Sequence, residues 1–443
     1  ASDVYKRQAY EGLSNAGEMG TNLIIVVNDN EMSIAENHGG LYQNLKELRD
    51  TEGRSSCNFF RSLGLDYLYV GEGNDIPSLV AAFAKVKDTS RPTVVHIHTQ
   101  KGKGYAPAEA DREEFHWEMP FDLETGKPKV DCSGMEDYHS LTGKFLLEKM
   151  KEDHTVVAIS SGTPTVIGFT PERRKQAGRQ FVDVGIAEEH AVALASGIAA
   201  GGGRPVYGVY STFVQRCYDQ LSQDLCINGN PAVITVFMGT VAGMNDVTHL
   251  GFFDIPLISN IPNMVYLAPT CSEEYFAMLE WAVRQTEYPV AIRVPGAAVV
   301  HRKEEFDTDY SELNRYKMTA RGETVAILAL GAFYDLGQAL KNKLREESGV
   351  EATLINPRYI TGLDEPMLEE LKVRHRIVVT LEDGVLDGGF GEKIARYYGN
   401  SEMRVLNYGL RKEFADRYNL DELMKANRLT DKQMAEDIAG ILE

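Results

Sequence analysis

Short apolar runs alternate with longer amphipathic stretches along this chain, and this alternation limits the fold more than any other feature of the sequence. Eight runs have the length and composition of buried strands: 23–27, 93–98, 156–159, 233–237, 265–267, 325–330, 351–355 and 376–380. Amphipathic stretches such as 76–87, 140–151 and 274–285 lie between them. Buried strands that alternate with helices form parallel sheets covered on both faces. The sequence therefore predicts an α/β protein built on parallel sheets.

Two polar stretches divide these elements into three groups. The stretch 122–137 contains Gly126, Pro128 and Gly134, and the stretch 300–319 is dense in charge and poor in apolar periodicity. Such segments are typical of linkers. We predict three parallel-sheet α/β domains, at 1–122, 138–297 and 320–443, a number that suits a chain of 443 residues.

The composition excludes several classes of function. Lys and Arg number 46 against 65 Asp and Glu, a net charge of -19, so neither a nucleic acid nor an anionic membrane is expected as a partner. The five cysteines show no CxxC spacing, which indicates reduced thiols, a cytoplasmic location and no zinc site. The most apolar long stretch, 191–210, is broken by glycines at 201–203, and nothing resembles a secretory signal.

The tripeptide Asn28-Asp29-Asn30 directly follows the apolar run 23–27. An oxygen-rich strand end of this kind suits a Mg²⁺ ion that is bound to a diphosphate. Asn and Asp are also ordinary turn formers after a strand. The pattern alone leaves both interpretations open.

Three further segments make the pattern specific. They are 183–192 (DVGIAEEHAV), 210–216 (YSTFVQR) and 248–251 (THLG). Together with the tripeptide they resemble the thiamine-diphosphate enzymes of the transketolase group, most closely the 1-deoxy-D-xylulose-5-phosphate synthase family. The resemblance runs from Ala9 to the end of the chain. It implies a diphosphate-binding, a pyrimidine-binding and a C-terminal domain in that order, thiamine diphosphate and Mg²⁺ as cofactors, and a homodimer.

The resemblance assigns five residues of the first domain to the cofactor and the substrate. Asn30 and the backbone of Met32 would bind Mg²⁺, Lys101 and Tyr105 would lie beside the thiazolium and diphosphate, and His116 would face the reacting carbons. The alternatives are structural. The run 101–104 (KGKG) is also a common flexible turn, and a lone His beside a Trp is often a packed surface group.

In the second domain, the resemblance places the catalytic carboxyl at Glu188. A buried carboxyl is needed there to share a proton with N1′ of the aminopyrimidine, so that the cofactor's own amino group can act as a base. From chemistry alone, Glu189 and His190 compete for this role, and an acidic pair at a helix start is also a capping feature. Phe213 matches the aromatic residue that stacks on the pyrimidine, although Phe is usually a core residue.

The substrate side combines matches with departures from the family. Tyr210, Arg216 and His249 match substrate residues, and His249 is also a candidate catalytic group. Met238 and Gly296 stand where the family has phosphate-binding arginines, and Asn245 replaces an Asp. The loss of two guanidinium groups would weaken recognition of a phosphate dianion. Arg216 and Arg293 would remain as anchors.

The ends of the chain also differ from the family. The family has a Gly-Asp-Gly motif with a metal-binding Asp near this position, but the first eight residues do not resemble the family. We therefore expect a fragment, in which Asp3 could replace that ligand. The C-terminal domain is expected to be structural and to support a dimer. Its segment 414–419 (FADRYN) lacks the Pro and Gly usual in the family, without a consequence that the sequence reveals.

The resemblance implies that pyruvate is decarboxylated and joined to glyceraldehyde 3-phosphate to give 1-deoxy-D-xylulose 5-phosphate, a precursor of isoprenoids and thiamine. Two alternatives stay open. One is a transketolase-like enzyme with a different, unphosphorylated acceptor, which the residues Met238 and Gly296 favour. The other is a fragment without catalytic activity that only binds partners.

Overall fold

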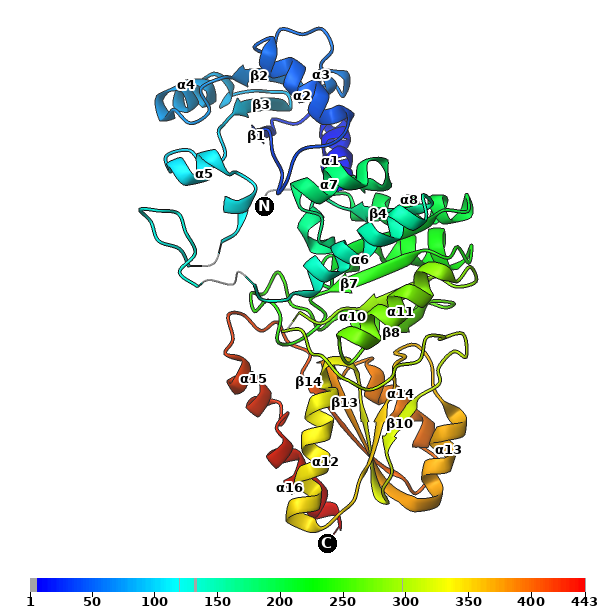
Figure 1. The fold of residues 1–443 in the computed structure, drawn as a ribbon. Helices are drawn as coiled ribbons and strands as arrows, with labels where there is room; N and C mark the ends of the chain where they lie inside the picture. Colours follow the sequence, from blue (N-terminus) through cyan, green and yellow to red (C-terminus); the bar gives the residue numbers. More distant parts are fainter. Residues whose placement is uncertain (1–5, 119, 131–133, 297, 443) are drawn as a thin grey trace. The chain divides into compact units, whose positions relative to one another are not determined.

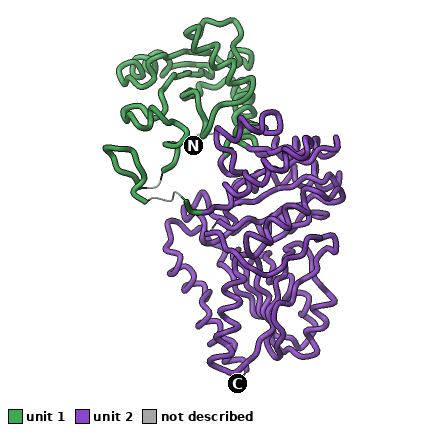
Figure 2. Tube along the Cα trace, in the orientation of Figure 1, with its two compact units in different colours: residues 1–135, 161–164, 183–187 green, residues 136–160, 165–182, 188–443 purple. Residues whose placement is uncertain are grey.

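The computed structural model describes residues 6–118, 120–130, 134–296 and 298–442. The chain forms two compact units (Figure 2). Unit 1 contains most of the first 135 residues together with the short segments 161–164 and 183–187, and unit 2 contains the remainder. The two units are described separately below.

Unit 1 is built on a parallel sheet with the strand order β1-β3-β2. The strands are β1 (Ile24–Asp29), β2 (Asp66–Val70) and β3 (Thr93–His98). Val94 and Val95 point to opposite faces, as neighbours on a strand must, and each joins a different apolar cluster. The helices α1 (Lys6–Met19), α2 (Gly40–Asp50) and α3 (Phe59–Ser62) contribute to the first cluster, and α4 (Ile76–Val86) contributes to the second. Both faces of the sheet are therefore covered, as the sequence predicts.

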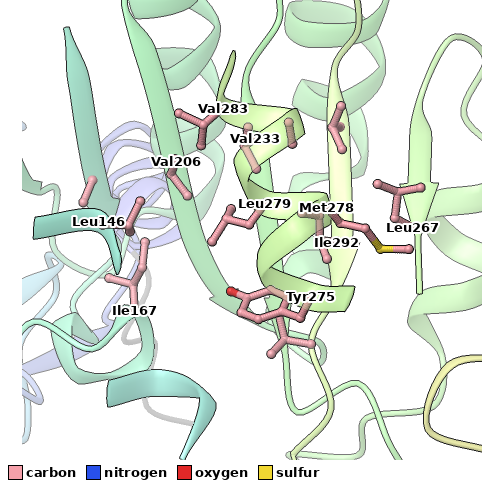
Figure 3. Packing of buried hydrophobic residues seen from close by; sticks show 14 of the residues in the cluster. Leu146, Ile167, Val206, Val233, Leu267, Tyr275, Met278, Leu279, Val283 and Ile292 are labelled. Atoms are coloured by element: carbon pink, nitrogen blue, oxygen red, sulfur yellow. The ribbon is translucent and has the colours of Figure 1, made fainter. Parts of the chain in front are cut away.

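Unit 2 contains a six-stranded sheet in the order β5-β4-β6-β7-β9-β8. The registers from β4 through β6, β7 and β9 to β8 are parallel. Its strands are β4 (Val156–Ser160), β5 (Phe181–Asp183), β6 (Arg204–Tyr210), β7 (Val233–Phe237), β8 (Val265–Leu267) and β9 (Val290–Arg293). The helices α6 (Tyr138–Glu152) and α11 (Ser272–Arg284) bury Leu146, Tyr275 and Leu279 against Val206 and Val233 (Figure 3). Helix α8 (Glu188–Ala200) packs on β6 with residues outside this cluster.

A second sheet follows in unit 2 (Figure 1). It has five strands in the order β10-β12-β11-β13-β14. Its strands are β10 (Lys317–Ala320), β11 (Thr324–Ala329), β12 (Thr353–Asn356), β13 (His375–Val385) and β14 (Arg404–Leu410). The helices around it are α12 (Tyr334–Ser348), α13 (Glu365–Arg374), α14 (Phe390–Tyr398), α15 (Leu420–Ala426) and α16 (Asp431–Leu442). One detail departs from the prediction of purely parallel sheets, because β10 pairs with β12 in the antiparallel direction. This short edge strand was not predicted, since it continues directly from the charged stretch 300–319.

The predicted strands and helices are present, with shifts at their ends, and the strands β2, β5, β6, β9, β10 and β14 were missed. Strand β6 shows why: its sequence RPVYGVY contains Arg, Pro and Gly, yet it pairs on both sides inside the sheet. The predicted domain boundaries stay a prediction. Within the described residues, no helix combines the length and apolar character required to span a bilayer.

Candidate active site

The carboxylate of Asp29 at the end of β1 serves the fold of unit 1. Its side chain is 2 % exposed and pairs with Arg49 of α2, and its Oδ2 atom lies 3.0 Å from Nε2 of His96 on β3. Burial acts to raise the pKa of Asp29, but the hydrogen bonds to His96 and Arg49 outweigh it and lower the pKa below its usual value. Asp29 is therefore a buried ion-pair partner, which joins β1 to its neighbours.

Asn30 and Met32 form a tight turn directly after Asp29. The Oδ1 atom of Asn30 accepts a hydrogen bond from the Met32 amide at 3.1 Å, and Glu31 between them has a φ of 67°. This is the turn that the sequence left open as an alternative. It also fixes Oδ1 at the carboxyl end of β1, where ligands bind in open α/β sheets.

Lys101 lies against the residues that follow this turn. Its Nζ atom donates to the carbonyl oxygens of Ser33 at 2.8 Å and Ile34 at 3.2 Å. Burial lowers the pKa of Lys101, and the nearby Glu113 partly opposes this. The structure thus brings one predicted cofactor residue next to the Asn30–Met32 turn.

His116 and Tyr105 lie in the segment after β3. Burial lowers the pKa of His116, and the positive charge of Lys101 adds to that effect. The imidazole of His116 is therefore biased towards its neutral form. The hydroxyl of Tyr105 donates to the Leu123 carbonyl at 3.1 Å, and its ring meets Phe115 edge to face at 5.7 Å. Tyr105 therefore stabilises its own loop.

The oxygen atoms at the end of β1 suit a metal ion that is bound chiefly through a ligand. Within the ranges that the structure describes, no group of three or more His, Cys, Asp or Glu could hold a metal ion. Asn30 and the backbone carbonyls offer neutral oxygens, and Mg²⁺ commonly takes one or two protein ligands together with phosphate oxygens and water. Asp3, the predicted replacement ligand, lies outside the described residues.

In unit 2, Glu188 is the first residue of α8 and its side chain is deeply buried. The residue is 2 % exposed, and Ala191 and Val192 beside it are fully buried. Burial raises the pKa of Glu188 above its usual value, and a hydrogen bond from Arg216 opposes this only in part. Glu188 is thus a carboxyl group that holds a proton more strongly than an ordinary glutamate.

Arg216 bridges two neighbouring glutamates. Its Nη1 atom donates to Oε2 of Glu188 at 3.1 Å, and its Nη2 atom donates to Oε1 of Glu189 at 3.0 Å. The resemblance predicts that Arg216 binds the substrate. In the structure its charge is shared between the two carboxylates, so it acts directly on the proton affinity of Glu188.

Three aromatic side chains meet at the end of β6 and on the loops that follow β6 and β7. The ring of Phe213 meets His249 at 5.4 Å and Tyr210 at 5.8 Å, both edge to face. The Nδ1 atom of His249 contacts Oδ1 of Asp246 at 3.1 Å and the Thr248 hydroxyl at 2.8 Å. Unit 2 thus brings the segments 210–216 and 248–251 together. Asp246, three residues before His249, was missed, although this spacing is a usable signal for a carboxylate that orients a histidine.

The departures on the substrate side have a structural basis. Met238 has a φ of 57°, and a Cβ atom at position 296 would overlap its sulfur, so the Met238 side chain fills the space beside Gly296. The expectation that Arg293 serves as a phosphate anchor is wrong. Arg293 is 3 % exposed, its Nε atom donates to Asp254 at 2.7 Å, and it also pairs with Asp383.

The residues of unit 2 fit an aminopyrimidine ring. Such a ring requires an acid that keeps its proton near a ring nitrogen and an aromatic surface for stacking. Glu188, whose pKa burial raises, is the candidate for the first, and Phe213, directly before the helical turn Val214–Cys217 that carries Arg216, is the candidate for the second.

Sequence comparisons place three family models on the chain. Residues 6–58 match the model of 1-deoxy-D-xylulose-5-phosphate synthase, residues 136–299 match the pyrimidine binding domain of transketolase, and residues 315–434 match the transketolase C-terminal domain. A curated 1-deoxy-D-xylulose-5-phosphate synthase of Lachnoclostridium phytofermentans is 33 % identical over 96 % of this chain and 74 % of its own length. The 1-deoxy-D-xylulose-5-phosphate synthase 1 of Geobacter sulfurreducens is 34 % identical over 92 % of this chain and 70 % of its own length.

Solved structures show the same fold. A transketolase of Pichia stipitis in complex with sedoheptulose 7-phosphate matches 98 % of this chain and 74 % of its own, with a TM-score of 0.58 and 14 % identity. A split-gene transketolase, described as an inactive β4 tetramer, matches 68 % of this chain and 96 % of its own, with a TM-score of 0.58 and 21 % identity. At these identities the likeness concerns the fold alone.

Proposed function

The chain belongs to the 1-deoxy-D-xylulose-5-phosphate synthase family, and we propose that it is a transferase that joins pyruvate to glyceraldehyde 3-phosphate with loss of CO₂. The product would be 1-deoxy-D-xylulose 5-phosphate, which supplies isoprenoid and thiamine biosynthesis. The observation that carries the proposal is the buried carboxyl of Glu188, whose pKa is raised, on an element next to the Phe213 loop, the segment 211–217 that follows β6. The different-acceptor alternative is not favoured, because the curated relatives are named as synthases.

Thiamine diphosphate, when bound, supplies the carbon nucleophile and the electron sink that decarboxylation of a 2-oxo acid requires. Glu188 has the part of the proton donor to the pyrimidine ring nitrogen. Its raised pKa suits that part, because burial makes the carboxyl group hold its proton more strongly.

Arg216 is best explained as a residue that positions Glu188 and limits its pKa. The guanidinium holds the carboxyl group at 3.1 Å and places a positive charge beside it. A phosphate group that drew Arg216 away would raise the proton affinity of Glu188 further. We therefore propose that Arg216 acts on the cofactor side as well as on the acceptor side.

The aromatic and histidine side chains have parts in binding. Phe213 offers a flat face to the pyrimidine, and the Tyr210 ring packs edge to face against the Phe213 ring at 5.8 Å. His249, which Asp246 and Thr248 hold through Nδ1, is oriented so that Nε2 can donate to or accept from a substrate oxygen. In unit 1, the neutral form of His116 is suited to accept a proton or hydrogen bond from the substrate.

At the end of β1, we propose Oδ1 of Asn30 and the carbonyl of Met32 as the oxygen ligands of Mg²⁺, and Lys101 and Tyr105 as neighbours of the diphosphate. The Asn30–Met32 turn supports the metal assignment because it fixes Oδ1 in one place. A homodimer and a cytoplasmic location belong to the same proposal, which rests on the family membership and on the absence of CxxC spacing in the sequence.

The assignment is tested by assaying release of CO₂ from pyruvate separately from formation of the sugar phosphate. We expect both, with glyceraldehyde 3-phosphate preferred over unphosphorylated glyceraldehyde. Met238→Arg should lower the KM for the phosphorylated acceptor, because a second cation would meet the dianion. Equal use of both aldehydes, with no response to Met238→Arg, would replace the synthase by an enzyme with a different acceptor.

A further inference from the structure

The loop that carries His249 is bonded along its length to the C-terminal part of the chain. This His249 loop, residues 238–253, connects β7 to α10 (Asp254–Ser259) and contains no strand or helix of its own. An irregular loop of this length keeps one conformation only if other residues bind it, because ordering each residue costs conformational entropy. The contacts described below provide that binding, and they come from two sides.

The outer contacts come from the segment 416–418, after β14. The hydroxyl of Tyr418 donates to the carbonyls of Val241 at 2.7 Å and Met244 at 3.4 Å. The Arg417 amide donates to the Asn245 carbonyl at 2.6 Å, and the Val247 amide donates to Oδ1 of Asp416 at 3.1 Å. These bonds fix the loop just before His249.

Asn245 adds a contact that an aspartate could not make. Its Nδ2 atom donates to the Tyr418 carbonyl at 3.1 Å. An ionised carboxyl at this position has no donor and would face that carbonyl oxygen with a negative charge. The sequence shows departures from its relatives both at Asn245 and in the segment 414–419, and the structure places these two departures in contact.

The inner contacts come from a buried charge cluster beneath the loop. Arg293, at the end of β9, donates from Nη2 to the Gly251 carbonyl at 3.0 Å and pairs with Asp383 of β13. Asp254 is the other carboxylate on this guanidinium, and it also accepts a hydrogen bond from Ser211 at 3.0 Å, two residues before Phe213. The cluster therefore touches both loops of the candidate site.

Two more bonds complete the connection. The Val385 amide of β13 donates to the Phe252 carbonyl at 2.9 Å. The Thr212 hydroxyl donates to the Thr248 carbonyl at 3.0 Å, which ties the Phe213 loop to the His249 loop. His249 thus lies between anchored points on either side of it in sequence, and its distance to Phe213 depends on both.

We propose that the C-terminal part of the chain positions His249 by holding the His249 loop against the Phe213 loop. Tyr418 and its neighbours bind the loop from outside. Asp383 binds it from beneath, through Arg293. These are positioning residues, since they act through the loops. The inference rests on the proposed function only for the role that it gives to His249 in binding substrate. It adds a positioning role to a domain that the sequence predicts to be structural and to support a dimer.

Amide hydrogen exchange of the purified full chain tests the outer contacts. Tyr418→Phe removes the hydroxyl that binds Val241 and Met244, and its matched control is Tyr398→Phe, whose hydroxyl donates to the Leu368 carbonyl at 2.8 Å elsewhere in the same part of the chain. We expect exchange in residues 241–250 to increase about fivefold in Tyr418→Phe, the usual effect of one net hydrogen bond. Tyr398→Phe should leave that segment unchanged.

Asp383→Asn tests the inner contact, with Glu274→Gln as control. Glu274 is also a buried carboxylate between the same two sheets, where it accepts from Asn356 at 2.8 Å, but it does not bond to the His249 loop. We expect faster exchange in 248–253 and in 211–213 for Asp383→Asn alone. In steady-state assays, Tyr418→Phe and Asp383→Asn should raise the KM for the aldehyde acceptor more than they lower kcat.

The inference is overturned if loop exchange is unchanged in both test variants, or rises equally in the controls. A chain with no synthase activity whose loop exchange still responds to Tyr418→Phe would remove the proposed function and keep the positioning contacts. Synthase activity with no change in loop exchange in the test variants would keep the proposed function and remove the positioning contacts. The two failures are therefore distinguishable.

Discussion

Asp29 and Glu188 are both buried carboxyl groups at the end of a secondary-structure element, yet their proton affinities are shifted in opposite directions. The pKa of Asp29 is lowered, and the pKa of Glu188 is raised. Burial raises both. Asp29 has Arg49, His96 and the Glu31 amide as partners, whereas Glu188 shares the single guanidinium of Arg216 with Glu189. The direction of the shift therefore depends on whether the hydrogen-bond partners outweigh desolvation, as they do for Asp29 and do not for Glu188.

The largest effect is expected for Glu188→Gln. If Glu188 provides the proton for cofactor activation, this variant should bind thiamine diphosphate but exchange the cofactor's C2 proton roughly 10²- to 10⁴-fold more slowly. NMR measurement of that exchange checks the prediction, and Glu189→Gln, which removes the neighbouring carboxylate on the same arginine, is the control. Equal loss in both variants, or no loss in Glu188→Gln, would show that Glu188 is only an acidic residue at a helix start.

Asp29→Asn should lower the stability of unit 1 rather than slow the exchange of the cofactor's C2 proton. The substitution removes the buried carboxylate that pairs with Arg49 and leaves Arg49 only the more distant Glu31, at 3.8 Å; breaking such a pair costs about 3 kcal/mol. We expect unfolding of unit 1 at lower urea concentration, as followed by hydrogen exchange of β1 and β3. A variant with unchanged stability of unit 1 would show that Asp29 is not needed for the fold and is open to a ligand role.

Arg216→Lys tests how a single cation is divided between two carboxylates. Lysine keeps the charge but loses the forked geometry that reaches both glutamates. We expect the pKa of Glu188 to rise further and the KM for glyceraldehyde 3-phosphate to increase by about tenfold, with CO₂ release changed less. Titration of ¹³C-labelled glutamate checks the first part and steady-state kinetics the second. A higher KM with no change in the Glu188 titration would restrict Arg216 to the acceptor.

The opposite pKa shifts predict opposite effects of pH on stability. In the folded protein, the pKa of Asp29 lies below its ordinary value of 3.8, so the ion pair stabilises the protein at neutral pH. This contribution to stability is lost as the pH falls through the pKa of the folded state. The pKa of Glu188 is raised above 4.5, so its contribution falls as the pH rises from 4.5 through the folded value. Relative to the wild type, Glu188→Gln should therefore gain stability with rising pH, and Asp29→Asn should lose it. Urea unfolding at several pH values measures both differences, and parallel curves would contradict the assignment.

The smallest effect is expected for Asn30→Ala at the end of β1. Its oxygen is neutral, so loss of one Mg²⁺ contact should weaken cofactor binding by less than about tenfold. Isothermal titration with thiamine diphosphate and Mg²⁺ measures this. Asn28→Ala is the control, since Oδ1 of Asn28 accepts a hydrogen bond from the Thr99 hydroxyl at 2.6 Å. Tight binding that survives Asn30→Ala would place the metal on other ligands.

Family membership and most of the fold could be predicted from the sequence, because both depend on local features. Strand β3 and helix α4 follow from continuous apolar or amphipathic runs, and Asp75, which accepts a hydrogen bond from the Ser78 amide at 2.9 Å, marks where α4 begins. Strand β6 was missed because its Pro and Gly are unfavourable in isolation. The parallel neighbours on both sides of β6 outweigh that local preference.

The candidate site divides in the same way. The sequence determined which side chains are present and that Glu188, Phe213 and His249 belong to one motif set. Only the tertiary structure decided that Arg216 bridges Glu188 and Glu189, that Arg293 is neutralised by Asp254 and Asp383, and that Tyr418 holds the His249 loop. The reason is physical. The chemistry of a residue is fixed by its type, but its pKa and availability depend on the partners that folding brings beside it from distant parts of the chain.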